Sequence, residues 1–185
     1  MTERILMAGH GGQGIIFMGK LLAQSAMVEG REVTFFASYG AEVRGGVSNC
    51  SVVISSQRIA SPIVGEPDVL VAMNESSFRQ FEPSASPEGL IFLNRSIVTL
   101  EAERDDVQVV AVHANEIAHD LGVPAVANMV MLGALIGRTG MVGLSTVVDA
   151  LKSTLPESRH YLLEVNYGAL KAGIERTELC SERVS

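Results

Sequence analysis

Apolar residues along the chain gather in short runs that alternate with longer segments of helical spacing. Residues 4–8 (RILMA) lead directly into glycines and are typical of a buried parallel strand. Over residues 15–29 the apolar positions recur at roughly helical intervals, and Gly30 follows as a stop signal. Residues 33–37 (VTFFA) are rich in β-branched and aromatic side chains, so they predict the next strand.

These segments predict a strand, a glycine loop, a helix and a second strand. A right-handed crossover would make the two strands parallel neighbours in one sheet. Residues 48–55 and 58–61 are expected to form a hairpin or edge strands around a polar turn.

The rest of the chain continues the alternation. Strands are predicted at 69–73, 90–94 and 107–113, and helices at 125–137, 145–155 and 157–176. Asn115 is expected to cap a short helix that reaches Leu121. The pattern predicts an α/β three-layer fold, with a mostly parallel Rossmann-like sheet and helices on both faces. We expect a single domain over residues 1–176 and a polar C-terminal tail over residues 177–185.

One apolar stretch raises the question of a membrane. Residues 121–137 carry no charge, yet they include Pro124 and Asn128 and are short for a bilayer span. Apolar residues make up 47% of the chain, which favours a sheet buried on both faces or a surface covered by a partner. We therefore expect no membrane span, but a helix in the protein interior or at a subunit interface.

Charge and cysteine usage narrow the function classes. The net charge is −7 and tryptophan is absent, so nucleic-acid binding is disfavoured. Cys50 and Cys180 are far apart and form no CxxC motif, which excludes an iron–sulfur cluster or structural zinc held by this chain alone. Two such thiols suit a reducing cytoplasm, where we expect the protein. The spacing of His113 and His119 does not predict a metal site.

A glycine loop separates the first strand from the first helix. Gly9, Gly11 and Gly14 match the GxGxxG pattern, whose exposed N–H groups and helix dipole favour an anion. The acid that would bind a ribose at the end of the second strand is missing, since Glu29 and Glu32 precede that strand. The glycines could equally serve close packing of strand, helix and a neighbouring chain. Gln13 is expected to be an exposed amide at the start of the helix.

A second motif, YGAEVRGG, occupies residues 39–46. Glu42 and Arg44 would point the same way in an extended segment, and Gly45 and Gly46 permit a bend. Such a charged pair at the carboxyl edge of a parallel sheet favours a site or an interface, although a solvated loop would also explain it. Asn74, which follows a strand, suits either a site residue or a helix cap.

Together these motifs resemble the gamma subunit of the 2-oxoacid:ferredoxin oxidoreductases. The resemblance rests on their order and spacing and covers nearly the whole chain, most weakly over residues 75–121. The segments that carry it are GHGGQGIIFMGKLLAQSAMVEGREV (9–33), SYGAEVRGGVSNCSVVIS (38–55), IASPIVGEPDVLVAMN (59–74), NMVMLGALIGRTG (128–140) and NYGALKAG (166–173).

The resemblance implies a role in a shared enzyme. Such complexes oxidise a 2-oxoacid with coenzyme A to an acyl-CoA, carbon dioxide and reduced ferredoxin. Thiamine diphosphate, Mg²⁺ and [4Fe–4S] clusters are implied on the alpha, beta and, where present, delta subunits, so this chain would bind no cofactor tightly and hold no catalytic residue. This chain would complete the assembly and help close the coenzyme A side of the active-site cleft. The motifs favour 2-oxoglutarate, then ketoisovalerate, then pyruvate.

Two sets of site residues follow from the resemblance. Contact with coenzyme A phosphates or a partner subunit is expected at Gly11, Gly12, Gln13, Gly14 and Arg44. Interface residues are expected at Tyr39, Glu42, Arg44, Gly45, Gly46 and Asn74. Alone, the chain could form a homodimer. The alternatives are a stand-alone Rossmann-like module for a nucleotide or acyl-CoA, and an NAD-dependent enzyme, against which the missing acid argues.

Overall fold

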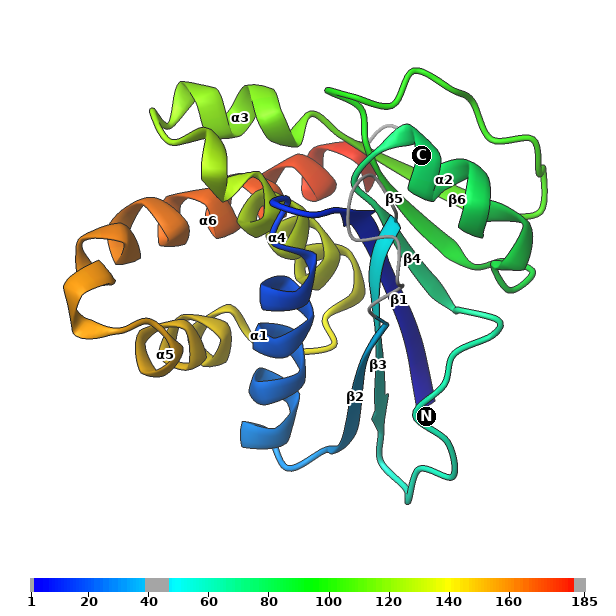
Figure 1. Cartoon of the computed structure of the whole chain (residues 1–185), viewed down its shortest axis with the longest axis horizontal. Coiled ribbons are helices and arrows are strands. Elements are labelled where there is room, and N and C mark those ends of the chain that lie inside the picture. Colours follow the sequence, from blue (N-terminus) through cyan, green and yellow to red (C-terminus); the bar gives the residue numbers. More distant parts are fainter. Residues whose placement is uncertain (1, 39–46, 182–185) are drawn as a thin grey trace.

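A six-stranded sheet in the order β2-β3-β1-β4-β5-β6 runs through the centre of the chain (Figure 1). The computed structural model describes residues 2–38 and 47–181, the last four of these by backbone alone. The strands are β1 (Thr2–His10), β2 (Glu32–Ser38), β3 (Val47–Ser55), β4 (Val69–Ala72), β5 (Leu90–Asn94) and β6 (Gln108–Val112). β1, β4, β5 and β6 pair in parallel, whereas β3 is antiparallel to both of its neighbours. The sheet is therefore mostly parallel, as predicted.

The order of the first three strands differs from the prediction. β1 and β2 run in the same direction but are not neighbours, because β3 lies between them and pairs with both. Residues 48–55 were expected at an edge or in a hairpin with residues 58–61, and that expectation is wrong. Residues 50–55 are buried throughout, as suits a strand with a neighbour on each side and packing on both faces. Residues 58–61 form no strand.

Helices cover both faces of the sheet, but unequally. α1 (Ile15–Val28), α3 (Ala114–Asp120), α4 (Ala127–Thr139), α5 (Leu144–Thr154) and α6 (Leu163–Ser181) contribute to the larger core on one face. The other face carries α2 (Glu75–Phe81) and a smaller core around Phe78, Leu70 and Ile91. Three short 3-10 turns complete the chain: η1 (Glu82–Ser84), η2 (Pro124–Val126) and η3 (Glu157–Leu162). Figure 1 shows α1, α4, α5 and α6 on one side of the sheet and α2 on the other.

The uncharged stretch of the sequence becomes a helix of the protein interior. Residues 127–136 of α4 are all buried. α6 packs so closely on α4 that a Cβ built on Gly173 would lie 2.1 Å from the carbonyl oxygen of Val130. A glycine pair makes this approach feasible, because a Cβ on Gly133 would equally meet the Leu170 carbonyl oxygen at 2.1 Å. Among the helices described, none is both long and apolar enough to cross a membrane.

Helix termini depart from the prediction at two places. α3 begins at Ala114 with His113 at its cap position, so Asn115 does not cap it. Instead, Oδ1 of Asn115 accepts a hydrogen bond of 2.7 Å from Nδ2 of Asn94. α6 runs through Ser181, so the segment predicted as a tail begins in helix. The division into residues 1–176 and 177–185 stays a prediction.

Candidate functional site

The carboxyl ends of β1 and β4 mark the topological switch point of the sheet. These two strands are parallel neighbours. The helix that follows β1 packs in the larger core, and the helix that follows β4 packs in the smaller core on the opposite face. Ligands of open α/β sheets usually bind outside the carboxyl ends at such a point. The glycine loop before α1 lies here, next to the start of α2.

Backbone conformation or close packing explains three of the glycines in this loop. Gly12 and Gly14 have φ angles of 93° and 73°, which residues other than glycine rarely adopt. A Cβ on Gly14 would also lie 2.3 Å from Nδ2 of Asn128, and a Cβ on Gly9 would lie 2.6 Å from Oε1 of Gln13. Gly11 differs from these, because its φ is not positive and no atom of the described residues lies within 4 Å of the position its Cβ would take. Gly11 is therefore the loop position where neither backbone conformation nor close packing among the described residues accounts for the glycine.

The start of α1 presents backbone donors. The first hydrogen bond of the helix runs from the N–H of Met18 to the carbonyl of Gly14. In the part of the chain that the structure describes, the N–H groups of residues 14–17 have no hydrogen-bond acceptor. Their partial positive charge adds to the helix dipole, so this end of α1 favours an anion.

Gln13 is not the exposed amide that the sequence suggested. Its Oε1 accepts hydrogen bonds from the backbone N–H of His10 at 2.9 Å and from Nδ2 of Asn74 at 3.1 Å. Its Nε2 donates to the carbonyl oxygen of Met73 at 3.0 Å. The half-buried side chain therefore joins the glycine loop to the end of β4, across the switch point.

Asn74 carries out the second of its two predicted roles. Its Oδ1 accepts from the N–H of Ser77 at 2.9 Å and so caps α2, while its Nδ2 donates to Gln13. The residue is 7% exposed. Its assignment to an interface with a partner stays a prediction.

Two asparagines of this edge were missed by the sequence analysis as contributors to the site. Asn94, at the end of β5, is fully buried, and its Nδ2 donates to Asn115. Asn128, in the first turn of α4, lies against Gly14 and donates to its carbonyl oxygen at 3.4 Å. The signal for Asn94 was its place directly after a predicted strand, the same place that drew attention to Asn74. No such signal marked Asn128, which stands inside an apolar segment.

The strand order argues against a dinucleotide site. An acid that binds a ribose normally ends the strand beside β1. Here β3 takes that place, and it is antiparallel to β1. Glu32 begins β2 and pairs with Ser55, at the edge of the sheet away from the glycine loop. Among the residues that the structure describes, the acid of β2 lies away from the glycine loop, and the absence of a ribose-binding acid stays a prediction.

The second motif lies outside the described residues. This applies to Tyr39, Glu42, Arg44, Gly45 and Gly46, whose expected roles stay predictions. The flanking residues are described. Ser38 ends β2, and Val47 begins β3 in register with His10, which ends β1 and leads into the glycine loop.

Titratable groups elsewhere do not form a second centre near the loop. Nδ1 of His113 lies 3.0 Å from Oε1 of Glu116 on the surface, and His119 lies beside Asp120. Across residues 2–38 and 47–177, no three His, Cys, Asp or Glu side chains are arranged to hold a metal ion. Burial raises the pKa of the Cys50 thiol to about 12, so this cysteine is protonated at neutral pH.

Known proteins match the chain over nearly its full length. The ketoisovalerate oxidoreductase subunit VorA of Methanothermobacter thermautotrophicus is 38% identical over 93% of this chain, which spans only 36% of that relative's length. The 2-oxoglutarate synthase subunit KorC of the same organism is 35% identical over 95% of both chains. A keto/oxoacid ferredoxin oxidoreductase gamma subunit from Geobacter sulfurreducens superimposes with a TM-score of 0.82. It is 30% identical, and the match covers 96% of this chain and 99% of that one.

The matching family model spans residues 4–176 and so includes all of the sheet except the first two residues of β1, together with the glycine loop and most of α6. Since the fold, the loop and the relatives agree, the chain belongs to the pyruvate ferredoxin/flavodoxin oxidoreductase family.

Proposed function

We propose that this chain is the gamma-type subunit of a multi-subunit 2-oxoacid:ferredoxin oxidoreductase. The reaction is oxidative decarboxylation of a 2-oxoacid with coenzyme A, giving an acyl-CoA, carbon dioxide and reduced ferredoxin. One observation carries the proposal: the chain matches the separate subunit KorC over 95% of both lengths. VorA, by contrast, contains the matching region within a longer polypeptide.

The redox chemistry belongs, on this proposal, to alpha, beta and, where present, delta partners that hold thiamine diphosphate, Mg²⁺ and [4Fe–4S] clusters. The described residues of this chain do not fit a cluster. Cys50 is buried and protonated, and its Sγ donates to the carbonyl of Ile15 at 3.6 Å. A cluster needs several thiolates in reach of one another. The chain contributes assembly and ligand contacts instead.

The start of α1 fits one group that such a complex uses, the phosphates of coenzyme A. Among the described residues, the N–H groups of residues 14–17 have no acceptor, and no atom lies within 4 Å of the Cβ position of Gly11. Phosphate oxygens accept hydrogen bonds from such amides without any cationic side chain. Gln13 holds the loop in place, and Gly12 and Gly14 give it its curvature. Arg44 adds a positive charge from the neighbouring motif, and Tyr39, Glu42, Gly45, Gly46 and Asn74 contribute to the contact with a partner subunit.

2-Oxoglutarate is the proposed substrate of the complex, ahead of ketoisovalerate and pyruvate. The agreement in length with KorC supports this order, as does the YGAEVRGG motif. The acid is selected mainly by the other subunits, so the assignment concerns the complex and not this chain.

Reconstitution tests the proposed function. The complex, purified with and without this chain, is assayed for 2-oxoacid-dependent reduction of a viologen dye, with each of the three acids in turn. We expect activity only when the chain is present, highest with 2-oxoglutarate. A complex that turns over equally well without the chain would contradict the role of a subunit, and a preference for another acid would contradict the substrate.

The proposed phosphate contact has its own test. Arg44→Glu and Gly11→Ala are introduced singly into the assembled complex, and KM for coenzyme A is compared with KM for the 2-oxoacid. We expect KM for coenzyme A to rise for both variants, with KM for the 2-oxoacid unchanged. Gly65→Ala is a matched control, because Gly65 is also exposed with open space at its Cβ position. Unchanged KM for coenzyme A in both variants, with intact assembly, would dismiss the contact.

A further inference from the structure

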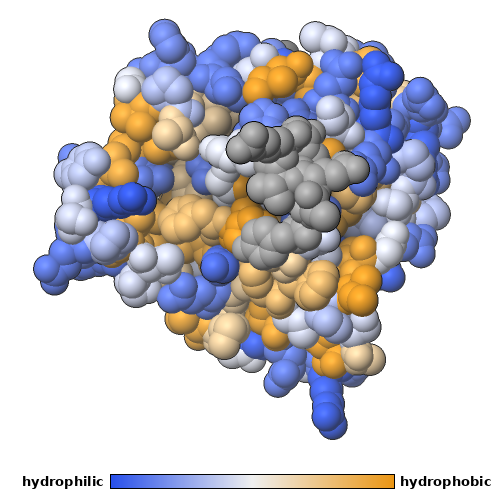
Figure 2. Space-filling view, in the orientation of Figure 1, coloured by the Kyte–Doolittle hydropathy of each residue, from blue (hydrophilic) through white to orange (hydrophobic). Residues whose placement is uncertain are grey.

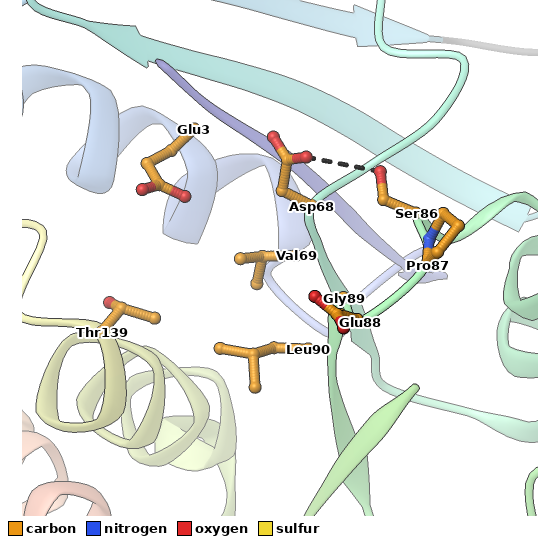
Figure 3. Close-up of a pocket in the computed structure, with 9 residues that line it drawn as sticks. All are labelled: Glu3, Asp68, Val69, Ser86, Pro87, Glu88, Gly89, Leu90 and Thr139. Carbon is orange, nitrogen blue, oxygen red and sulfur yellow. Dashed lines mark hydrogen bonds between the residues drawn. The ribbon is translucent and has the colours of Figure 1, made fainter. Parts of the chain in front are cut away.

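Two pockets of opposite charge lie at the amino edge of the sheet, away from the glycine loop. The acidic pocket has a volume of about 310 Å³ and includes Glu3, Asp68 and Glu88 (Figure 3). The basic pocket has a volume of about 230 Å³ and includes Arg4 and Arg58. Glu3 and Arg4 are successive residues of β1, so their side chains lie on opposite faces of the sheet.

Each pocket contains charged groups that have no partner. Asp68 is already paired, because it accepts from Nη2 of Arg4 at 2.8 Å and from Oγ of Ser86 at 3.3 Å. Among the residues that the structure describes, no hydrogen bond or ion pair reaches the side chains of Glu3, Glu88 or Arg58. What remains on one side of β1 is the carboxylate of Glu88 and that of Glu3, which feels the charge of Arg31 but forms no ion pair with it. On the other side is the unpaired guanidinium of Arg58.

The acidic pocket has the chemistry to receive an arginine side chain. Figure 3 shows Glu3 and Thr139 on one side of the pocket, with Val69 and Leu90 beside them on the strands, while the Asp68 carboxylate is turned toward Ser86. An arginine stem packs on apolar carbons, and its guanidinium donates to carboxylate and hydroxyl oxygens. Burial and then the charge of Asp68 raise the pKa of Glu3, while the charge of Arg31 lowers it, and a further cation placed beside Glu3 would favour its ionised form.

We propose that the two pockets form a self-complementary docking surface for a second copy of this chain, with Arg58 of each copy entering the acidic pocket of the other. A twofold axis that lies in the plane of the sheet and crosses its strands brings the two amino edges together and exchanges the faces. Each acidic pocket then meets a basic one, as an isologous interface requires. An axis perpendicular to the sheet would place like charges together.

An exposed apolar residue adds to this surface. Ile63 also lines the basic pocket and is 69% exposed. Next to Arg58 it gives the edge a mixed apolar and charged character that is typical of interfaces. The net charge of −7 repels two copies in general, so contact depends on a local match of charge.

Charge reversal tests the proposal on the isolated chain. The dissociation constant of the dimer is measured by sedimentation equilibrium for wild type, Arg58→Glu and Glu88→Lys, with circular dichroism to confirm folding. We expect each reversal to weaken self-association by about tenfold or more, because two symmetric ion pairs become like-charge contacts. Arg159→Glu is the matched control, an equal change of charge at an exposed position on η3.

Mixing the two variants gives the decisive result. In a heterodimer of Arg58→Glu with Glu88→Lys, one contact pairs the new glutamate with the new lysine and the other pairs the original arginine with the original glutamate. We therefore expect the mixture to associate although each variant alone does not. A monomeric wild type, an association that tolerates Arg58→Glu, or a mixture that stays monomeric would each overturn the proposal.

Discussion

The side-chain amides of Gln13 and Asn74, 61 residues apart in the sequence, meet in a hydrogen bond of 3.1 Å. Gln13 belongs to the loop before α1, and Asn74 caps α2 on the opposite face of the sheet. The contact therefore joins the two helices that diverge at the switch point. The Gln13 side chain itself therefore lies between the glycine loop and the end of β4.

Removing this amide is expected to destabilise the fold. Gln13→Ala loses three hydrogen bonds and leaves Nδ2 of Asn74 and the N–H of His10 without acceptors. We expect a loss of ~1–3 kcal/mol in the free energy of unfolding, measured by urea denaturation. Gln57→Ala serves as control, since Gln57 is exposed and its hydrogen bond to Oγ of Ser55 uses the backbone N–H. Equal stability of the two variants would show that the Gln13 amide does not secure the loop.

Substitutions at Gly14 and Gly11 are expected to separate the effect of the loop on stability from its effect on ligand binding. Gly14→Ala combines a φ of 73° with a collision against Asn128, so we expect a loss of about 1–3 kcal/mol. Gly11→Ala meets no atom, so the unfolding free energy should change by less than about 0.5 kcal/mol. Both are measured by thermal unfolding.

A double-mutant cycle identifies the cause of the Gly14 effect. In an Asn128→Ala background the collision disappears while the backbone strain remains, so Gly14→Ala should cost less there than in wild type. An equal cost in both backgrounds would assign the whole effect to the backbone conformation.

The sequence predicted most elements because their patterns are local. β1, α1 and β5 follow from apolar runs and from helical spacing bounded by glycine. The insertion of β3 between β1 and β2 was not predictable in the same way, because strand order depends on pairing between distant segments. The composition of residues 50–55 could have indicated a central strand, because it is too apolar for an edge strand.

The sequence analysis named the parts of the candidate site but not their contacts. It placed the glycine loop and Asn74 separately, each directly after a strand, and the structure brings them together. The direction of the Gln13 side chain was missed, since two of its three partners, Met73 and Asn74, lie between β4 and α2, far along the chain. Asn128 was missed for the same reason, because its neighbour Gly14 is 114 residues away.

Close packing of α4 on α6 yields a third prediction. Gly173→Ala would drive a methyl group to 2.1 Å from the Val130 carbonyl oxygen, against backbone that has no room to move. We expect a loss of about 1–3 kcal/mol or more in the free energy of unfolding. Gly168→Ala, in the same helix, meets only a methyl of Leu121 at 3.7 Å and should be neutral or stabilising by up to about 1 kcal/mol. Urea denaturation of the two variants decides this, and similar losses would refute the close approach.

Cys50 gives a prediction about pH. Burial raises the pKa of its thiol to about 12, whereas an unfolded cysteine titrates near about 8.5. Between these values the unfolded chain has released its proton and the folded chain has not, so the folded state binds more protons. The stabilisation from the protonated thiol is fully present below the pKa of the unfolded chain and is lost as the pH rises through the pKa of the folded chain.

Two measurements check this in a Cys180→Ser background, where Cys50 is the remaining thiol of the chain. The free energy of unfolding should fall more steeply between pH 9 and 11 in this protein than in a Cys50→Ala variant, because alanine has no proton to release. At pH 8, a thiol reagent should modify Cys50 only as fast as the chain unfolds, since the thiolate is the reactive form and the buried sulfur is protonated. Rapid modification of the native protein, or identical pH slopes for the two variants, would show that Cys50 ionises freely in the folded state.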